Sequence, residues 1–424
     1  MSLRIAILGT RGIPNFYGGF EQLAEHLAPG LVRAGHDVTV YNSHNHPFQG
    51  DEWDGVRIIH CYDPEYILGS AGQFVYDLNC LLDARKRNFD VILQLGYTSS
   101  SVWGALFPPG AMVIYNMDGL EWQRSKYSRI ARRFLLYAEK LAVKYSDFYV
   151  TDSPVIQSYF RDKYGIRSEY IAYGADLFPA ADESVLKEYK VIPGDYYLLM
   201  ARMEAENNIG TILDGFSRSD TKRKILVVGN IANKFGRQIK ARFGNDPRII
   251  FTGGIYAQPT IHALKFHSRM YFHGHSTGGT NPSLLEAMAS RALIAAHDNA
   301  FNREVLGGDA LYFSSAAEIT HLVDNTPSGE PEMIMTRNNR EKILRRFNWP
   351  EIIMKYEKFI GQSLAIHKKA DPVFMQRYEN KNTLPPMETG TTGHTGTAGH
   401  TGANGHVGSN GHTGIFHPDH RRRV

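Results

Sequence analysis

Residues 4–42 read RIAILGTRGIPNFYGGFEQLAEHLAPGLVRAGHDVTVYN, and this stretch decides the fold class. The apolar run RIAIL is typical of a buried strand, and it leads into a glycine-rich loop. Residues 20–35 then carry apolar side chains at helical spacing, and DVTVYN forms a second strand pattern. A strand, loop, helix and strand in this order predict one unit of a parallel sheet.

The same alternation of strand-like and helix-like segments runs through the rest of the chain. In the first half the strand patterns are VRIIH, DVILQL, MVIYN and DFYVTD. After an irregular passage, YYLLMA, KRKILVVG, RIIFTG, RMYFHG and ALIAAH form a second series. The sequence therefore predicts an α/β protein with two Rossmann-like doubly wound domains.

The predicted boundaries follow from these two series. We expect an N-terminal domain at 1–176, a linker at 177–194, a C-terminal domain at 195–348, and a helix at 349–370 that packs on a domain face or crosses back to the first domain. Residues 371–424 have low complexity, with glycine-histidine pairs at every sixth position. We predict that this tail is disordered, and metal binding by its histidines is the weaker alternative.

Composition excludes several classes of protein. The 424 residues carry a formal net charge of +4, too balanced to make nucleic acid the expected partner. Only Cys61 and Cys80 occur, so no disulfide framework or cysteine-rich zinc site is predicted. No run of about 18 apolar residues indicates a spanning helix, and the first residues do not form a signal peptide pattern. The expectation is a cytoplasmic protein, with peripheral membrane association as a further option.

The loop after the first strand contains Gly9, Gly12, Gly18 and Gly19, at the place where α/β folds bind phosphate. The spacing is not the dinucleotide pattern G-x-G-x-x-G, which disfavours a dehydrogenase. Glycines that serve only a turn are the alternative interpretation.

The second half contains two further candidate segments. In ARMEAENN, Arg202 ends a strand, where its guanidinium could reach phosphate oxygens or could pair with Glu204 or Glu206. In HSTGGTNPSLLEAMAS, residues 275–290, the small residues precede a helix that Thr280 or Asn281 could cap. Free amides at this helix start favour an anion. Glu286 in the helix suits a hydrogen bond to ribose hydroxyls, and the alternative is an acid that complements the helix dipole.

Together, these motifs resemble the family 4 glycosyltransferases of the GT-B fold. Within that family, the stretches GTRGIPNFYGGFEQLAEHL, NMDGLEW and HGHSTGGTNPSLLEAMA look most like bacterial rhamnosyltransferase-type enzymes of surface polysaccharide synthesis. The resemblance covers residues 4–368. It implies two domains that face a crevice, a nucleoside-diphosphate sugar donor held mainly by the second domain, and a saccharide acceptor approached from the first.

The resemblance also implies roles for individual residues. The donor phosphates would lie near the glycine pair Gly18 and Gly19 and near Arg202. The ribose would lie at Glu286, and the nucleotide base would lie against the loop after RIIFTG. Three family features are absent: asparagines replace a lysine, Gly278 replaces the first acid of a Glu-x7-Glu motif, and Met117 stands roughly where a histidine is often found. The implied donor-binding residues are Gly18, Gly19, Arg202, Asn207, Asn208, Gly254, Ile255, Gly278, Gly279, Thr280, Asn281 and Glu286.

The mechanism implied by the family retains the anomeric configuration. The chain contains no Asp-x-Asp sequence, so we expect no metal and no cofactor. Arg202 and helix-terminal amides would stabilise the leaving diphosphate. The crevice histidine often found in the family corresponds roughly to Met117, which leaves Asp118 as the nearest polar candidate. Asp118 or Glu21 would orient or deprotonate the acceptor hydroxyl.

Residues 122–145 place basic side chains among aromatic ones, which suits an anionic membrane surface and a lipid-linked acceptor. A helix packed on the sheet with solvated charges is the alternative. Two other functions stay open: a nucleotide-sugar epimerase of the same fold, and a nucleotide-sugar or carbohydrate-binding protein that has lost catalysis.

Overall fold

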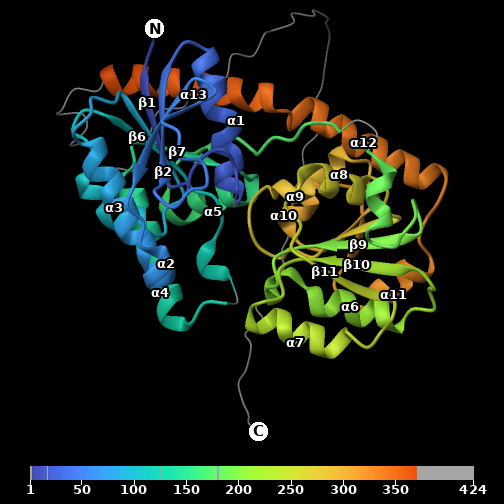
Figure 1. Cartoon of the computed structure of the whole chain (residues 1–424). Helices are drawn as coiled ribbons and strands as arrows, with labels where there is room; N and C mark the ends of the chain where they lie inside the picture. Colours follow the sequence, from blue (N-terminus) through green and yellow to red (C-terminus); the bar gives the residue numbers. More distant parts are fainter. Residues whose placement is uncertain (1, 17, 125, 179–180, 370–424) are drawn as a thin grey trace, which may run out of the picture. The chain divides into compact units, whose positions relative to one another are not determined.

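Two parallel β-sheets form the framework of the chain (Figure 1). The computed structural model describes residues 2–16, 18–124, 126–178 and 181–369, and these residues belong to one compact unit. The predicted tail at 371–424 lies outside the described residues.

The first sheet has the strand order β3-β4-β2-β1-β5-β6-β7-β8, and every pair is parallel except β3 with β4. Its strands are β1 (Arg4–Leu8), β2 (Asp37–Ser43), β3 (Glu52–Trp53), β4 (Val56–Cys61), β5 (Val91–Leu95), β6 (Met112–Asn116), β7 (Phe148–Thr151) and β8 (Glu169–Tyr170). The associated helices are α1 (Gly19–Arg33), α2 (Glu65–Leu68), α3 (Gly72–Ala84), α4 (Arg129–Tyr145) and α5 (Pro154–Tyr164). Short 3₁₀ helices occur at η1 (Gly69–Ala71), η2 (Ser100–Leu106) and η3 (Glu121–Gln123).

The second sheet has the order β11-β10-β9-β12-β13-β14 and is parallel throughout. Its strands are β9 (Tyr196–Met200), β10 (Lys224–Val228), β11 (Ile249–Gly253), β12 (Met270–His273), β13 (Ile294–His297) and β14 (Leu311–Phe313). The helices are α6 (Ile209–Arg218), α7 (Lys234–Phe243), α8 (Gln258–Phe266), α9 (Pro282–Ala289), α10 (Ala300–Leu306), α11 (Ala316–Asp324), α12 (Glu330–Arg346) and α13 (Trp349–Lys369), with 3₁₀ turns at η4 (Glu183–Lys187) and η5 (Ala205–Asn207).

Both faces of the central strands of the first sheet are buried, which explains why these strands are mostly apolar. Along β1, Ile5 and Ile7 join one core cluster, which includes side chains of α1 and α13. Ala6 and Leu8 point to the opposite face and pack with side chains of α3, α4 and α5. This alternation is the two-residue period of a strand.

The last helix belongs to this first sheet as much as to the second half of the chain. The ring of Trp349 at the start of α13 stacks on His26 of α1, with centroids 4.1 Å apart. Further along α13, the hydroxyl of Tyr356 accepts a hydrogen bond from Asn116 Nδ2 at 3.1 Å. The helix therefore runs back over the N-terminal half.

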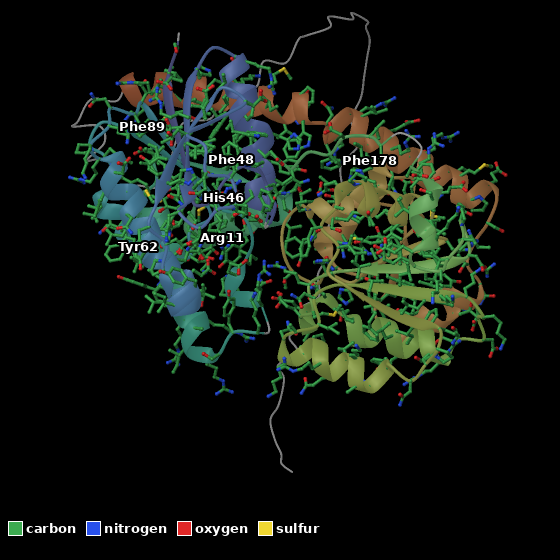
Figure 2. The ribbon with its side chains drawn as sticks, in the orientation of Figure 1. Arg11, His46, Phe48, Tyr62, Phe89 and Phe178 are labelled. Atoms are coloured by element: carbon green, nitrogen blue, oxygen red, sulfur yellow. The ribbon has the colours of Figure 1, made fainter. Side chains whose placement is uncertain are left out.

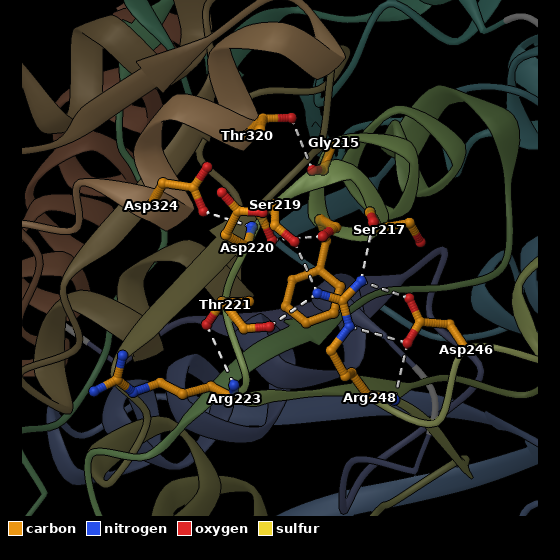
Figure 3. A network of polar contacts seen from close by, with 11 residues as sticks. Gly215, Ser217, Ser219, Asp220, Thr221, Arg223, Asp246, Arg248, Thr320 and Asp324 are labelled. Carbon is orange, nitrogen blue, oxygen red and sulfur yellow. Dashed lines mark hydrogen bonds and ion pairs between the residues drawn. The ribbon is translucent and has the colours of Figure 1, made fainter.

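A network around Arg248 fixes the end of α6 (Figure 3). The guanidinium donates to the carbonyl oxygens of Ser217, Ser219 and Thr221 at 2.9 Å each, and to the carboxylate of Asp246. These carbonyls have no partner inside the helix, so the arginine satisfies them as a C-terminal cap.

The predicted fold class is confirmed: the chain is an α/β protein with two Rossmann-like sheets. Strands β3, β8 and β14 were not predicted, because they are two or three residues long, too short for a repeated alternation. In the described part of the chain, no helix has the length and apolar character needed to cross a membrane. The same residues contain no group of three or more His, Cys, Asp or Glu side chains arranged to hold a metal ion.

Candidate functional site

The candidate residues lie on loops at the carboxyl ends of strands from both sheets. Arg202 follows β9, and residues 274–281 follow β12. From the first sheet, Asp118 follows β6 and Asp152 follows β7. Parallel strands present their carboxyl ends at one edge of a sheet, where α/β proteins bind ligands.

The start of α9 has the predicted capping geometry. Asn281 is the N-cap, and its Oδ1 accepts a hydrogen bond from the amide of Ser283 at 2.9 Å. Pro282 occupies the first helical position, where no amide is needed. The amide of Thr280 is not free: it donates to Asp152 Oδ2 at 2.8 Å, and the Thr280 hydroxyl also donates to the Asp152 carbonyl. A side-chain oxygen of Asp152, from the first half, thus occupies the position where an anion was predicted at this helix start.

The two loop glycines have different surroundings. A Cβ added to Gly279 would lie 1.9 Å from Asp152 Oδ1, so this glycine is required by the contact between the loop and Asp152. A Cβ at Gly278 would meet no atom within 4 Å. Its φ of +124° nevertheless disfavours any side chain. Only Gly278 therefore leaves open space beside the loop.

Glu286 is paired with a lysine that the sequence reasoning missed. Lys265 Nζ of α8 bonds to Glu286 Oε2, and the lysine side chain is fully buried. The other carboxylate oxygen, Oε1, accepts from Gln22 Nε2 of α1 at 3.4 Å. Glu286 thus connects α8, α9 and the first helix of the chain. A lone lysine in an amphipathic helix gives no sequence signal for a buried partner.

Arg202 is exposed, and its guanidinium makes no hydrogen bond with the residues that the structure describes. Its carbonyl accepts from Asn207 Nδ2 at 2.8 Å, and Asn208 Nδ2 donates to the carbonyl of Gly274 at 2.8 Å. Asn207 therefore stabilises the loop after β9, and Asn208 ties this loop to the loop after β12. Neither contributes the charge of the family's lysine.

Two cations of the first half approach the same loop. Arg124 pairs with Glu206 at 3.0 Å and with Glu121 at 2.8 Å. Lys126 pairs with Glu204 at 3.2 Å. Glu206 and Glu204, the predicted alternative partners of Arg202, thus form their ion pairs with Arg124 and Lys126, although the Arg202 charge also helps to lower the pKa of Glu204.

The loop after β12 begins with two stacked histidines. The rings of His273 and His275 lie 4.4 Å apart. Burial, with the charges of Arg202 and Arg124 nearby, lowers the pKa of His275 to about 3. Burial also holds the pKa of His273 well below its usual value, and neither ring nitrogen of His273 has a partner among the described residues. Both imidazoles are therefore neutral at physiological pH.

The carboxyl groups of Asp118 and Asp152 lie close enough to influence each other's pKa. Tyr173, which follows β8, donates its hydroxyl proton to Asp118 Oδ2 at 2.7 Å. Burial raises the pKa of Asp118, and the hydrogen bonds from Tyr173 and Asp152 act in the opposite direction. Burial and then the neighbouring Asp118 charge raise the pKa of Asp152 well above its usual range. Asp118 is partly exposed, whereas only 1% of Asp152 is exposed.

Glu21 and the glycine pair organise the loop after β1. Glu21 is buried, and its Oε1 accepts from the amide of Arg11 at 2.8 Å and from Thr10 Oγ1 at 3.4 Å. Gly18 is the N-cap of α1. A Cβ at Gly19 would lie 3.5 Å from Pro282 Cγ and 3.6 Å from the Tyr173 hydroxyl oxygen. The start of α1 therefore adjoins the start of α9.

The loop predicted to bind the nucleotide base follows β11. Gly254 is exposed, and Ile255 is partly buried against the core. Tyr256, which is 74% exposed, has its hydroxyl 2.8 Å from where a Cβ of Gly254 would stand. This loop belongs to the edge strand of the second sheet, two strands from β9.

Comparisons with known proteins bear on the fold. A family model described as a domain of unknown function (DUF1972) matches residues 101–176. No curated protein matches the chain.

Solved structures match most of its length. Sucrose-phosphate synthase from Thermosynechococcus elongatus is 17% identical with a TM-score of 0.70, over 86% of this chain and 100% of that one. HepE from Anabaena, in complex with UDP and glucose, is 15% identical with a TM-score of 0.64, over 85% and 100%. A UDP-forming α,α-trehalose-phosphate synthase from Burkholderia vietnamiensis is 11% identical with a TM-score of 0.62, over 86% and 100%. The chain therefore has the GT-B fold of these proteins.

Proposed function

We propose that the protein is a glycosyltransferase that moves a hexose or deoxyhexose from a nucleoside diphosphate to a saccharide acceptor. The observation that carries the proposal is the contact of the loop after β12 with loops of the first sheet, through Thr280 and Asp152. Transfer needs a donor and an acceptor held by two facing surfaces, and this contact brings the two sets of strand ends together. HepE, which has the same fold, was solved with UDP and glucose.

The donor diphosphate would lie between Arg202 and the loop of residues 278–281. Arg202 is exposed and has no competing bond among the described residues, so its guanidinium is available for two phosphate oxygens. This positive charge would stabilise the leaving diphosphate without a metal ion. The anomeric configuration would be retained, because the acceptor oxygen would attack from the face that the diphosphate leaves.

The sugar is proposed to be a deoxyhexose such as rhamnose. Where related enzymes present a carboxylate to the sugar, Gly278 presents no side chain and faces open space. A sugar with fewer hydroxyls leaves fewer unpaired donors there, which lowers the cost of the missing carboxylate.

An exposed aromatic surface on the first half suits the saccharide acceptor. Tyr62 follows β4 and is 50% exposed, and its ring lies 4.9 Å from that of His44, which follows β2. Tyr66 in α2 is 66% exposed and adjoins the same histidine. Figure 2 shows Tyr62 with Arg11, whose guanidinium pairs with Glu65 at 2.7 Å. Sugar rings present apolar C–H faces that pack on such aromatic rings.

Helix α4 supports a lipid-linked acceptor at an anionic membrane. Helical geometry places Arg129, Arg133, Lys140 and Lys144 within about 60° of arc, and all four are exposed. Ile130 and Tyr137, 81% and 55% exposed, lie beside them. Arg124, Lys126 and Leu135 were also expected to face the membrane. The first two are instead paired with Glu206 and Glu204, and Leu135 is buried in the protein.

Flotation with liposomes that contain anionic lipid tests this surface. Replacement of the four basic residues of α4 with glutamine should abolish salt-sensitive binding. A control variant would neutralise Lys234, Arg237 and Lys240 on α7, which are also exposed. Equal loss of binding in both variants would argue against a specific membrane surface.

A thermal-shift screen of nucleoside diphosphates and their sugars tests the activity itself. A ligand that binds only the folded protein raises its melting temperature, so the screen identifies base and sugar together. The best donor is then incubated with saccharide acceptors, and the anomeric configuration of the product is read by NMR. If no nucleotide stabilises the protein, the proposal is wrong. Isomerisation of the sugar without an acceptor would instead indicate the epimerase.

A further inference from the structure

Asp152 links the two halves of the candidate site. Its carboxylate Oδ2 accepts from the Thr280 amide at 2.8 Å, and its backbone carbonyl accepts from the Thr280 hydroxyl. Gly279 leaves just enough space for this carboxylate. On its other side Asp152 adjoins Asp118, whose carboxylate accepts from Tyr173 at 2.7 Å.

The hydrogen bonds around Asp118 and Asp152 indicate which carboxyl oxygen needs a proton. Two ionised carboxylates have no hydrogen to share, so one member of the pair must be protonated. Asp152 Oδ2 already accepts from an amide, whereas Oδ1 is buried and has no donor partner among the described residues. A proton on Oδ1 gives this atom a partner, because it can then donate to the Asp118 carboxylate.

The surroundings favour the neutral form on the more buried residue. Asp152 is 1% exposed, and Asp118 is partly exposed. Burying a charge without a counter-ion is costly, so the proton belongs on Asp152. The titratable and charged groups that interact with the pair are Glu121, Arg124, Tyr170, Tyr173 and Tyr356.

We propose that Asp152 stays protonated and donates through Oδ1 to the carboxylate of Asp118, and that it is thereby the positioning residue for Asp118 as the base of the transfer. The inference rests on the proposed function. In the transfer, Asp118 accepts the proton of the acceptor hydroxyl. The acceptor oxygen forms a bond to the anomeric carbon, and the bond from that carbon to the diphosphate breaks, with its electron pair leaving on the diphosphate.

Asp152 also bonds to Thr280, so it connects Asp118 to the loop of residues 278–281, where the sugar donor is proposed to bind. The Asp118 carboxylate receives two hydrogen bonds, from Tyr173 and from Asp152, and both favour its ionised form. Removal of the Asp152 donor should therefore make Asp118 harder to ionise.

Two variants of Asp152 test the assignment through the pH profile of kcat/KM. Asp152→Ala removes the donor, so we expect at least a tenfold loss of kcat and a shift of the acid limb to higher pH. Asp152→Asn can still donate to Asp118 and accept from Thr280. Its kcat should therefore be at least fivefold higher than that of Asp152→Ala, and the acid limb of its pH profile should return toward the parent value. An acid limb that Asp152→Ala does not move, or an asparagine variant as impaired as alanine, would overturn the proposal.

Infrared spectroscopy tests the proton without any activity. At pH 8 the buried Asp77, whose pKa burial raises to about 7, is mostly ionised. The difference spectrum between parent and Asp152→Asn should then show the carbonyl band of a protonated carboxyl, and the matched Asp118→Asn variant should keep this band. If the band disappears with Asp118→Asn and remains with Asp152→Asn, the proton lies on Asp118 and the assignment is wrong. This result stands even if the protein transfers no sugar.

Discussion

Lys265 and Glu286 form an ion pair in which the lysine side chain has no exposed surface. The pair joins α8 to α9, and Gln22 of α1 adds a hydrogen bond to the same carboxylate. A buried ammonium is stable only while its partner is present. Glu286 is therefore a structural residue as well as the candidate ribose ligand.

Replacing Lys265 with methionine should destabilise the protein by about 3 kcal/mol, because Glu286, whose side chain is only 14% exposed, then keeps its charge without its cation. Urea unfolding followed by circular dichroism measures the change. Lys240→Met on α7 is the control, since Lys240 is exposed, and its effect should stay within about 0.5 kcal/mol. Equal effects of the two substitutions would contradict the importance of the buried pair.

Gly279→Ala should destabilise the protein by about 1–3 kcal/mol, because the new methyl group would overlap the Asp152 carboxylate and one of them must move. A double-mutant cycle with Asp152→Ala measures this coupling through unfolding free energies. The double variant should lose less than the sum of the single losses, by about 0.5–3 kcal/mol. Strict additivity would mean that the overlap is relieved by movement of the loop alone.

The sequence could predict the fold and the loops of the site, but not the partners within them. Strand and helix patterns depend on local periodicity, so both sheets and the cap at Asn281 follow from the sequence. Asp152 was included only as the last residue of a strand pattern, and its contact with Thr280 spans 128 positions. No local pattern reports such a pairing. Gly279 was predicted to leave room for the ligand, and its packing against Asp152 could not be predicted for the same reason.

Asp77→Asn should remove a pH dependence of stability that a buried carboxyl creates. Burial raises the pKa of Asp77 from its usual value near 4 to about 7. An acid whose pKa is raised in the folded state stabilises that state most at low pH, and this contribution is lost as pH rises to about 7. The asparagine variant should therefore gain stability relative to the parent between pH 4 and pH 7, by up to about 1.4 kcal/mol per pH unit.

Urea unfolding at pH 5 and pH 8 checks this difference. Asp162→Asn is a matched control, because the Asp162 side chain is 69% exposed. The parent and the control should change in parallel with pH. If the stability difference between Asp77→Asn and the parent is the same at both values, Asp77 does not titrate in this range.

Substitutions at Gly278 test the proposed sugar. Alanine and glutamate must both adopt the unfavourable φ of +124° there, so both variants carry the same backbone cost. A comparison of their donor preferences therefore reports the effect of the carboxylate alone. Gly278→Glu, compared with Gly278→Ala, should shift preference from a deoxyhexose donor to a hydroxyl-rich hexose donor by about tenfold, the effect of one added hydrogen bond. Competition assays with the two donors measure the ratio of kcat/KM. An unchanged ratio would show that this position does not face the sugar.

Arg202→Ala should weaken nucleoside-diphosphate binding strongly and leave the fold intact. The guanidinium is exposed and bonds to no described residue, so its loss should change the unfolding free energy by no more than about 0.5 kcal/mol. Loss of a charged donor to the leaving group typically lowers kcat by about 10²–10³. Titration calorimetry with the nucleotide from the screen separates binding from catalysis. Arg218→Ala provides the control, because Arg218 is also exposed but lies at the opposite end of α6. If Arg202→Ala binds the diphosphate as tightly as the control does, the donor phosphates lie elsewhere and the site must be redrawn around Arg124 and Lys126, the cations that approach the loop from the first sheet.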